Sequence, residues 1–362
     1  MSSFAVEVKR IEEIWPHPTA DKLELARVEG LSYTCVVQKD IHTVGDLVVF
    51  FPVDSLLPLS LVKSLKLNFL AGPAQNRVKT VNLRGIYSEG LVIPINEIPV
   101  KITGTDVTDL LGVEKFEPPI DDIPGGELHR LPEGLSAYNI ESYEKYPEVM
   151  KLVQGMQCMV TEKLEGVNLS VTVRRDGPDV FVNQHTRTII EIEENSNLYW
   201  NVARSKNIIR IAQYLLELLA GVKQVTIIGE LVGPSIKAAR YYELPEDDVF
   251  VFDIKADGRF LDAWEMLHLL QTATSYLNVR SIPGEYVKNP PRPSAVPIIF
   301  TGNLSDWLQD MSITEASNGQ SALVNKLREG IVIKPLEEHG TRSLGRVIVK
   351  KRSPEYLIKT GM

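Results

Sequence analysis

The sequence predicts an α+β protein of two domains, a small β-barrel or sandwich followed by a mixed domain of antiparallel strands and helices. Three observations favour this class. Short strand-like segments with little helical periodicity fill about the first 100 residues. A stretch rich in proline and glycine follows them. Beyond about Met150, strand-like segments alternate with stretches whose apolar residues recur at helical spacing.

The first predicted domain, residues 1–118, consists of strands. Residues 4–56 contain the segments FAVEVKRIEEI, KLELARVEG, YTCVVQKD and DLVVFFPV, separated by turn signals such as Glu29-Gly30. VKTVNLRGIYS and GLVIPI add further strands. Five or more short strands in about 100 residues are typical of a small barrel or sandwich.

The predicted linker covers residues 119–148. It overlaps the stretch FEPPIDDIPGGELHRLPEG (116–134), which holds four prolines and three glycines. Proline removes a backbone donor and glycine adds chain entropy, so this stretch is poor material for the interior of a helix or strand.

The second predicted domain covers residues 149–362. A strand pair is expected at CMVTEKLEGVNLSVTVRR and DVFVNQHTRTII, joined at Asp176-Gly177, and a helix over 197–220 that ends at Gly221. VTIIGELVG and DVFVFDIK read as strands and LDAWEMLHLLQTATSYL as a helix. One or two helices are expected between Ser305 and Leu327, and the strands GIVIKP and RVIVKKR close the chain.

The amino-acid composition excludes several classes of protein. The 362 residues are 44% apolar and carry a net charge of −8, which is ordinary for a globular protein and argues against one that coats nucleic acid non-specifically. No run of about 18 apolar residues exists, so a membrane span is not expected. Cys35 and Cys158 have no partner spacing, which excludes a disulfide framework and predicts a cytoplasmic, reducing location.

Charged residues recur where apolar strands end. The sharpest case is the motif EKLEGVN (162–168), which places Lys163 between two carboxylates and before a glycine. Downstream segments carry Arg187, Glu230, Phe252-Asp253, Glu329 with Lys334, and Lys350-Lys351-Arg352. Residues 325–362 hold nine Lys or Arg against four Asp or Glu, a local charge of +5 that favours phosphate binding.

In this order, the segments resemble the motifs of the covalent nucleotidyltransferases, and within them the ATP-dependent RNA ligases. The GELVGP wording and the asparagine at position 168 are more similar to RNA ligases than to DNA ligases or capping enzymes. HPTADKL (17–23) with Val44-Gly45-Asp46 resembles tRNA-binding OB domains. The resemblance implies an N-terminal OB-fold module ahead of an adenylyltransferase domain, as in the RNA ligases that seal nicked duplexes.

The resemblance also implies the roles of the site residues. Lys163 is expected to be the nucleophile, with Glu165, Glu230, Glu329 and Lys350 as the other catalytic residues. A lysine between carboxylates has a raised pKa, so the glutamates are interpreted as holding Mg²⁺ or Mn²⁺, directly or through water, rather than as ion-pair partners of Lys163. The expected ATP-binding residues are Glu162, Asn168, Arg187, Phe252, Lys334, Lys350, Lys351 and Arg352.

Two assignments stay open. Phe252 is the preferred adenine-stacking ring, but Phe250 competes because strand alternation puts both on one face. The family usually shows Lys-x-Lys in the last strand, so either Lys351 or Arg352 faces the nucleotide.

The resemblance implies an ATP-dependent RNA ligase that forms a lysyl-AMP, transfers AMP to a 5′-phosphate end and seals it to a 3′-hydroxyl. Its expected partners are ATP, Mg²⁺ or Mn²⁺, and RNA, in a nicked RNA–RNA or RNA–DNA duplex. The alternatives are a DNA ligase, a GTP-using capping enzyme, or a non-catalytic RNA- or tRNA-binding OB protein.

Overall fold

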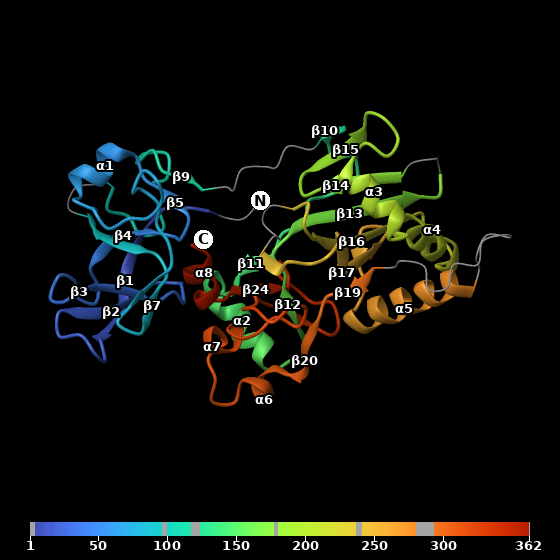
Figure 1. Cartoon of the computed structure of the whole chain (residues 1–362). Helices are drawn as coiled ribbons and strands as arrows, with labels where there is room; N and C mark the ends of the chain where they lie inside the picture. Colours follow the sequence, from blue (N-terminus) through green and yellow to red (C-terminus); the bar gives the residue numbers. More distant parts are fainter. Residues whose placement is uncertain are drawn as a thin grey trace. The chain divides into compact units, whose positions relative to one another are not determined.

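A computed structural model describes residues 4–95, 100–116, 124–176, 180–236, 241–279 and 293–361. The chain forms two compact units, and Figure 1 gives the element labels used below. Unit 1 comprises residues 1–119, 141–152 and 351–362, and unit 2 comprises residues 120–140 and 153–350. The described helices and strands confirm the α+β class.

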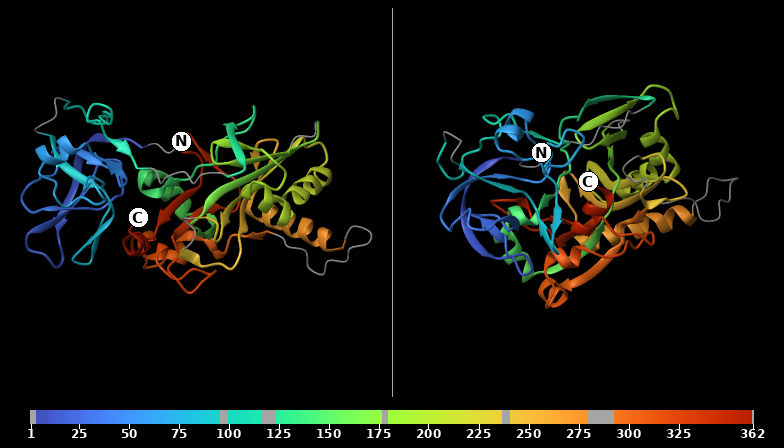
Figure 2. Two further views of the ribbon diagram at one scale, coloured as in Figure 1. Left: turned by 45° about the horizontal axis from the view of Figure 1, so that its top comes forward. Right: turned by 60° about the vertical axis from the view of Figure 1, so that its left-hand side comes forward.

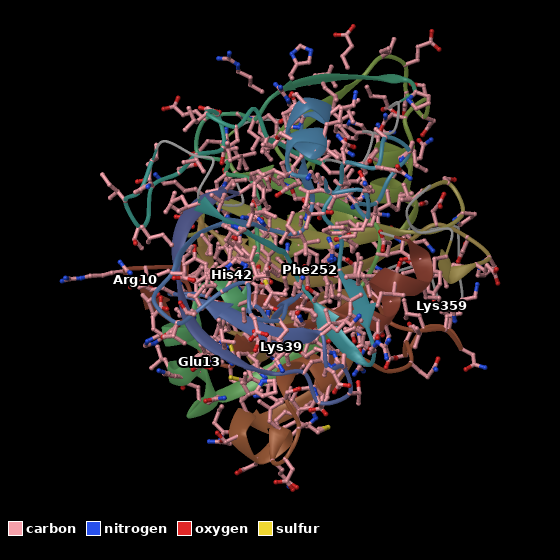
Figure 3. All side chains as sticks on the ribbon, turned by 90° about the vertical axis from the view of Figure 1, so that its left-hand side faces the viewer. Arg10, Glu13, Lys39, His42, Phe252 and Lys359 are labelled. Carbon is pink, nitrogen blue, oxygen red and sulfur yellow. The ribbon has the colours of Figure 1, made fainter. Side chains whose placement is uncertain are left out.

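The main sheet of unit 1 is built from the predicted N-terminal strands. It is antiparallel, in the order β3 (Cys35–Gln38), β2 (Leu23–Val28), β1 (Glu7–Pro16), β4 (Leu47–Phe51), β8 (Leu91–Pro94). Val8, Val49 and Phe51 lie in its core. Exposed side chains such as Arg10, Glu13 and Lys39 occupy the outer surface of β1 and the turn after β3 (Figure 3).

Shorter elements complete unit 1. They are β5 (Ser55–Leu56), α1 (Leu59–Ser64), β6 (Val81–Leu83), β7 (Ile86–Ser88), β9 (Glu114–Lys115), β11 (Glu141–Ser142), the 3₁₀ turn η2 (Tyr143–Lys145), most of α2 (Pro147–Gln154) and α8 (Pro354–Thr360). The described chain therefore divides differently from the predicted domains. Residues 124–140 of the expected linker lie in unit 2, and the last twelve residues belong to unit 1.

Unit 2 contains a large sheet covered on one face by helices (Figure 2). Its strands run in the order β10 (Gly126–Arg130), β15 (Arg187–Glu191), β14 (Val180–Gln184), β13 (Val167–Arg174), β16 (Gln224–Val232), β17 (Asp248–Ala256), β18 (Arg259–Phe260), and β19 (Ser294–Ala295) pairs with β17. The covering helices are α3 (Leu198–Ser205), α4 (Ile208–Leu218) and α5 (Ala263–Val279).

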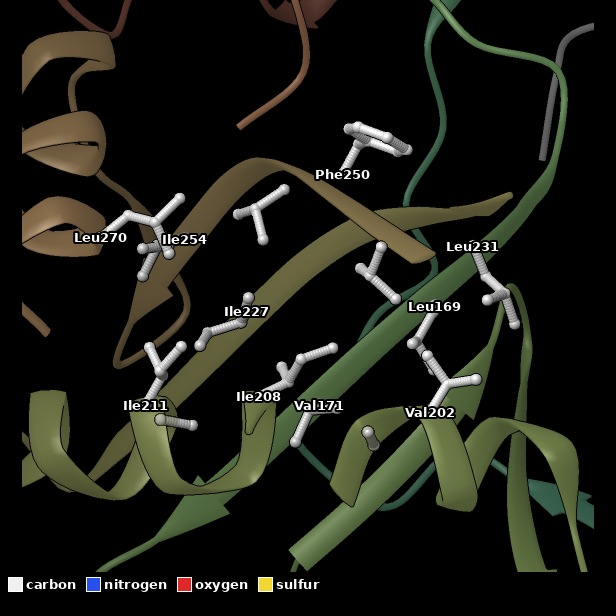
Figure 4. Packing of buried hydrophobic residues seen from close by; sticks show 14 of the residues in the cluster. Leu169, Val171, Val202, Ile208, Ile211, Ile227, Leu231, Phe250, Ile254 and Leu270 are labelled. Carbon is white, nitrogen blue, oxygen red and sulfur yellow. The ribbon is translucent and has the colours of Figure 1, made fainter. Parts of the chain in front are cut away.

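The two faces of this sheet differ because strand side chains alternate. On one face Val171 and Ile227 pack against Ile208 and Ile211 of α4, as Figure 4 shows. The opposite face carries the polar residues that alternate with them, among which Thr172 and Thr226 share a hydrogen bond of 2.9 Å. The helical layer thus forms the core, and the other face is left for polar groups.

A second sheet of unit 2 carries the predicted nucleophile. It contains β20 (Ile298–Asn303), β12 (Gln157–Lys163), β21 (Gly330–Pro335) and the start of β24 (Val349–Arg352). The remaining described elements are β22 (Gly340–Thr341), β23 (Gly345–Arg346), α6 (Leu304–Leu308) and α7 (Ile313–Ser317).

Two local predictions differ from the structure. The helix expected over 197–220 is two helices, α3 and α4, because Asn207 adopts a left-handed conformation with φ 57° between them. The expected strand CMVTEKLEGVNLSVTVRR is also two strands, β12 and β13, which join different sheets on either side of Leu164–Gly166. The predicted joint at Gly177 lies outside the described residues. Among the described residues, no helix is long and apolar enough to cross a membrane.

Candidate active site

Lys163 lies at the end of β12, next to the start of β21. The strand register pairs Lys163 with Gly330, so Glu329 is brought beside it. Nζ of Lys163 lies 2.6 Å from Oε2 of Glu329. The expectation that Glu329 would not be an ion-pair partner of Lys163 is therefore wrong.

Two further carboxylates act on the same amine. Glu230 comes from β16 of the large sheet, and Glu165 from the loop that follows Lys163. Burial by itself lowers the pKa of Lys163, but Glu329, Glu230 and Glu165 together raise it above its ordinary value. Burial and these neighbouring charges raise the pKa of Glu230 to about 8, although Lys163 opposes the rise. The structure thus brings the three predicted glutamates around one lysine.

Asn168 and Lys350 lie near this group. Asn168 on β13 is the direct cross-strand partner of Glu230. Lys350 on β24 is close enough to Glu230 to act against the rise of its pKa. Both residues are half-buried.

The loop after Lys163 is held by Tyr242 and requires Gly166. The backbone N–H of Glu165 donates a hydrogen bond of 3.1 Å to the buried Tyr242 hydroxyl. A Cβ on residue 166 would meet the Leu231 carbonyl oxygen at 2.5 Å and Cγ of Glu230 at 2.8 Å. The glycine of the motif therefore permits the close approach of the loop to β16.

The carboxylates fit a hard divalent cation by their chemistry, because Mg²⁺ takes oxygen ligands and keeps several of its waters. Within the part of the chain that the structure describes, no three His, Cys, Asp or Glu side chains are grouped closely enough to hold a metal together. The arrangement suits an ion held by one or two of these glutamates with water completing its shell.

Glu162 is buried at only 2% exposure. Its Oε2 accepts a hydrogen bond of 2.8 Å from the backbone N–H of Ala322, whereas its Oε1 has no hydrogen-bond partner among the described residues. Burial raises the pKa of this carboxyl. A buried acceptor without a donor is costly and is suited to a ligand that brings one.

Phe252 lies at a β-bulge in β17. The register pairs Ile228 with Asp253 and Gly229 with Val251, which leaves Phe252 as the extra residue. Its half-buried ring packs on the Tyr138 ring with centroids 4.9 Å apart. Phe250, the competing ring, is 7% exposed and belongs to the core cluster.

Lys334 lies behind Phe252 in a buried charge network. Its Nζ donates to the Phe252 carbonyl at 2.8 Å and to Oδ1 of Asp253 at 2.9 Å. Arg346 and the Tyr138 hydroxyl also bind the Asp253 carboxylate, at 2.7 and 2.5 Å. Burial alone would raise the pKa of Asp253, but Lys334 and Arg346 lower it to about 2.

Sequence reasoning missed Tyr138 and Arg346 as members of this network. Tyr138 falls in the predicted linker, and Arg346 entered only as part of a charge count. The available signal was an aspartate inside an apolar strand, since a buried carboxylate needs cationic partners from elsewhere in the chain.

Lys351 belongs to unit 1 and has its partners there. It is 1% exposed, and its Nζ binds Glu89 at 2.6 Å and also binds Glu144. These carboxylates outweigh the effect of burial and raise the pKa of Lys351. Arg352 lies 3.6 Å from Asp54 with its side chain 31% exposed. The placement of Lys351 does not support its expected contact with ATP.

Arg187 begins β15 at the turn after β14 and is exposed. Its cross-strand partners are Gln184 and Arg130. Alternation along β15 puts Arg187 on the side of the buried Ile189, opposite to the face that carries Asn183 and Thr188. Among the described residues, no ion pair joins Arg187 to the glutamates around Lys163.

Comparisons with known proteins cover both units. A family model described as RNA ligase matches residues 156–352, and an OB-fold domain model matches residues 5–95. The solved Naegleria gruberi RNA ligase with PPi is 27% identical, with a TM-score of 0.76, covering 99% of this chain and 98% of that one. A mutant of the same ligase with ATP and Mn is 26% identical, with a TM-score of 0.76 over 99% of each chain.

A further mutant of that ligase with AMP and Mn is 26% identical, with a TM-score of 0.76 over 98% of each chain. No curated protein matches the chain. The comparisons confirm the predicted OB fold at the N-terminus and the predicted resemblance to RNA ligases.

Proposed function

Because the chain belongs to the RNA ligase family, we propose that it joins RNA ends through a covalent AMP adduct on Lys163, at nicks in duplexes. The activity itself is ATP-dependent RNA ligation, as in the similar solved ligase that holds ATP and Mn. The proposed covalent AMP adduct rests on one observation: the Lys163 amine is enclosed by Glu329, Glu230 and Glu165.

In the first step, the Lys163 amine attacks the α-phosphorus of ATP. A P–N bond forms, the bond to the β-phosphate oxygen breaks, and pyrophosphate leaves. The amine must lose its proton first, and the carboxylates that raise its pKa oppose this. Glu329 and Glu230 are the residues that would hold a divalent ion, which when bound neutralises carboxylate and phosphate charge.

Two later transfers complete the reaction. A 5′-phosphate oxygen attacks the lysyl-AMP phosphorus, the P–N bond breaks, and the amine is restored. A 3′-hydroxyl then attacks the 5′-phosphate, AMP leaves, and a phosphodiester forms. Lys350 is the cation near the glutamates that would stabilise phosphate charge in these steps.

The nucleotide base would lie against Phe252, whose half-buried ring offers a stacking surface that the core residue Phe250 lacks. The unpartnered Oε1 of Glu162 would accept a hydrogen bond from the base amino group, and Asn168 would contact the sugar-phosphate part of the nucleotide. Lys334 would act through the network that fixes Phe252.

The proposal is tested by incubating the full chain with α-labelled ATP and Mg²⁺ or Mn²⁺, followed by a denaturing gel. Label should stay on the wild-type chain and be absent from Lys163→Ala. Equal labelling of the variant would contradict the lysine assignment. Sealing of nicked duplexes with RNA or DNA at each position then tests the substrate, and equal sealing of unpaired ends would contradict the duplex proposal.

We also propose a reducing, cytoplasmic location, because Cys35 and Cys158 are free thiols inside the protein.

A further inference from the structure

The polar face of the large sheet contains a cavity that the adenylylation site does not use. Its volume is about 130 Å³, and it lies between the sheet and residues 131–138. The groups that face it include Ser136, Tyr138, Ser170, Asn183, Thr226 and Lys255. This volume is below the 300–1,000 Å³ typical of pockets for drug-sized ligands, so it suits a sugar-sized group.

The cavity lies on the same face of the sheet as Asn168 and Glu230. Ser170 follows Asn168 by two residues on β13, and Thr226 precedes Glu230 by four on β16. At about 3.3 Å per residue, these groups lie roughly 7 and 13 Å further along the same face. A polymer chain that begins at the lysine can therefore reach the cavity along this face, past Ile228, which also lines the cavity.

The cavity is separate from the base-stacking ring. Tyr138 lines the cavity and also packs against Phe252, whereas Phe252 does not line it. A base stacked on Phe252 and a group in the cavity would occupy different places, with the Tyr138 ring next to both.

Lys255 brings a positive charge to the cavity without a carboxylate to balance it. Its Nζ donates to Ser136 Oγ at 3.2 Å and lies 4.4 Å from the centroid of the Phe260 ring. In the described parts of the chain Lys255 makes no ion pair, and the nearby Asp253 is already held by Lys334 and Arg346. Burial lowers the pKa of Lys255, with Arg346 adding to the effect. An anion in the cavity would compensate both for the burial of the Lys255 ammonium and for its repulsion by Arg346.

The neutral groups are suited to hydroxyls. Ser170 Oγ accepts a bond of 3.3 Å from Asn183 Nδ2, and Asn183 Oδ1 accepts one of 2.7 Å from Thr188. Within the described part of the chain no hydrogen bond uses the Ser170 hydroxyl proton or the second amide hydrogen of Asn183, so both can donate to a ligand. No Asp or Glu lines the cavity among the described residues, so it offers nothing that repels a phosphate.

We propose that this cavity is a subsite for one ribose-phosphate unit of the RNA strand, with Lys255 binding its phosphate and Ser170 and Asn183 binding its 2′-hydroxyl. This inference rests on the proposed RNA-joining function. It would explain a preference for RNA over DNA by a set of hydroxyl-binding groups outside the lysine site.

The first test measures the binding of a fluorescent RNA oligonucleotide by anisotropy, with the full chain and without ATP. Lys255→Gln should weaken RNA binding about tenfold, because a hydrogen bond to a charged group is lost. Lys223→Gln is the matched control, since Lys223 is an exposed lysine just before β16 that does not line the cavity. Equal RNA affinity of the two variants would overturn the proposal.

The second test compares RNA with DNA of the same sequence. Ser170→Ala should reduce the preference for RNA about fivefold through the lost hydroxyl contact, while Lys255→Gln should weaken RNA and DNA binding alike. An unchanged RNA preference in Ser170→Ala would overturn the ribose assignment.

A third measurement separates this inference from the proposed function. If Lys255→Gln lowers lysyl-AMP formation in the absence of RNA, the cavity belongs to the ATP site and the RNA subsite is wrong. If the wild-type chain forms no lysyl-AMP at all, the proposed function fails, whereas the RNA-binding comparison still decides the subsite.

Discussion

Nζ of Lys163 and Oε2 of Glu329 form an ion pair of 2.6 Å across 166 residues of sequence. The pair arises because β12 and β21 are antiparallel neighbours whose register sets Lys163 opposite Gly330. In this state the amine is held in its charged form by the carboxylate that would later bind a metal. Activation of the lysine therefore requires that this pair be opened.

Glu329→Ala should abolish metal-dependent lysyl-AMP formation and leave the fold intact. The substitution frees the amine but removes an oxygen ligand from the group that would hold the ion. Labelled ATP measures the adduct and circular dichroism the fold. Glu230→Ala should behave in the same way, and normal labelling in both variants would remove the metal-site proposal.

Tyr242→Phe should slow lysyl-AMP formation about tenfold with little change in the KM for ATP. The phenol accepts the backbone N–H of Glu165, so its loss lets the loop after Lys163 shift without removing any ATP contact. Tyr214→Phe on α4 makes the same chemical change in a half-buried tyrosine that stacks on Tyr276. Equal rates for the two variants would show that the Tyr242 hydroxyl does not position the loop.

Asp253→Asn should lower the free energy of unfolding by about 3–5 kcal/mol, measured with urea. Lys334 and Arg346 would remain at the buried site without the carboxylate that both bind. Asp248→Asn on the same strand should cost less than about 1 kcal/mol, because its ion pair with Lys206 is longer, at 3.4 Å, and more exposed. A cost for Asp253→Asn no larger than the control would refute the network.

The same carboxylate predicts an acid-dependent loss of stability. Its pKa in the folded protein is about 2, below the ordinary 3.8, so the stabilisation is complete above about pH 4 and is lost as the pH falls through 2. The difference corresponds to about 2 kcal/mol. Urea titrations between pH 5 and 2 should show this loss in the wild type and a smaller one in Asp253→Asn.

Lys351→Ala and Arg352→Ala separate a structural cation from an exposed one. Lys351→Ala should destabilise the protein by about 3–5 kcal/mol, since it leaves Glu89 and Glu144 without their shared partner. Arg352→Ala should cost less than about 1 kcal/mol, because its side chain is 31% exposed and 3.6 Å from Asp54. If Lys351→Ala melts at the wild-type temperature while ATP binding fails, Lys351 serves the nucleotide after all.

A chain that starts at Leu135 should be poorly soluble and melt at a lower temperature than the full chain. Residues 351–362 belong to unit 1, where α8 contacts β6 and Tyr356 is fully buried. Without residues 1–134, the apolar side chains of α8 become exposed to solvent and Lys351 loses its partner Glu89. Static light scattering and calorimetry measure the effect, and a soluble fragment with the melting temperature of the full chain would contradict it.

The pattern of charged residues at strand ends was sufficient to single out Lys163 and the glutamates that the structure brings beside it, whereas their expected roles came from the resemblance to RNA ligases. Lys163, Glu165 and Gly166 are contiguous, so their spacing is visible in one motif, and the apolar strands around Glu230 and Glu329 mark those residues as unusual. Strand periodicity likewise predicted the N-terminal sheet, because alternation is a local property of the chain.

The partners of the cations were decided by the tertiary structure alone. Lys334, Lys350 and Lys351 look alike in sequence, yet Lys334 binds a buried aspartate, Lys350 lies near Glu230, and Lys351 is enclosed by Glu89 and Glu144 within unit 1. The physical reason is that ion pairs and burial depend on strand register and on segments far apart in the chain. Periodicity determines which face a side chain occupies, whereas folding determines which charge it meets there.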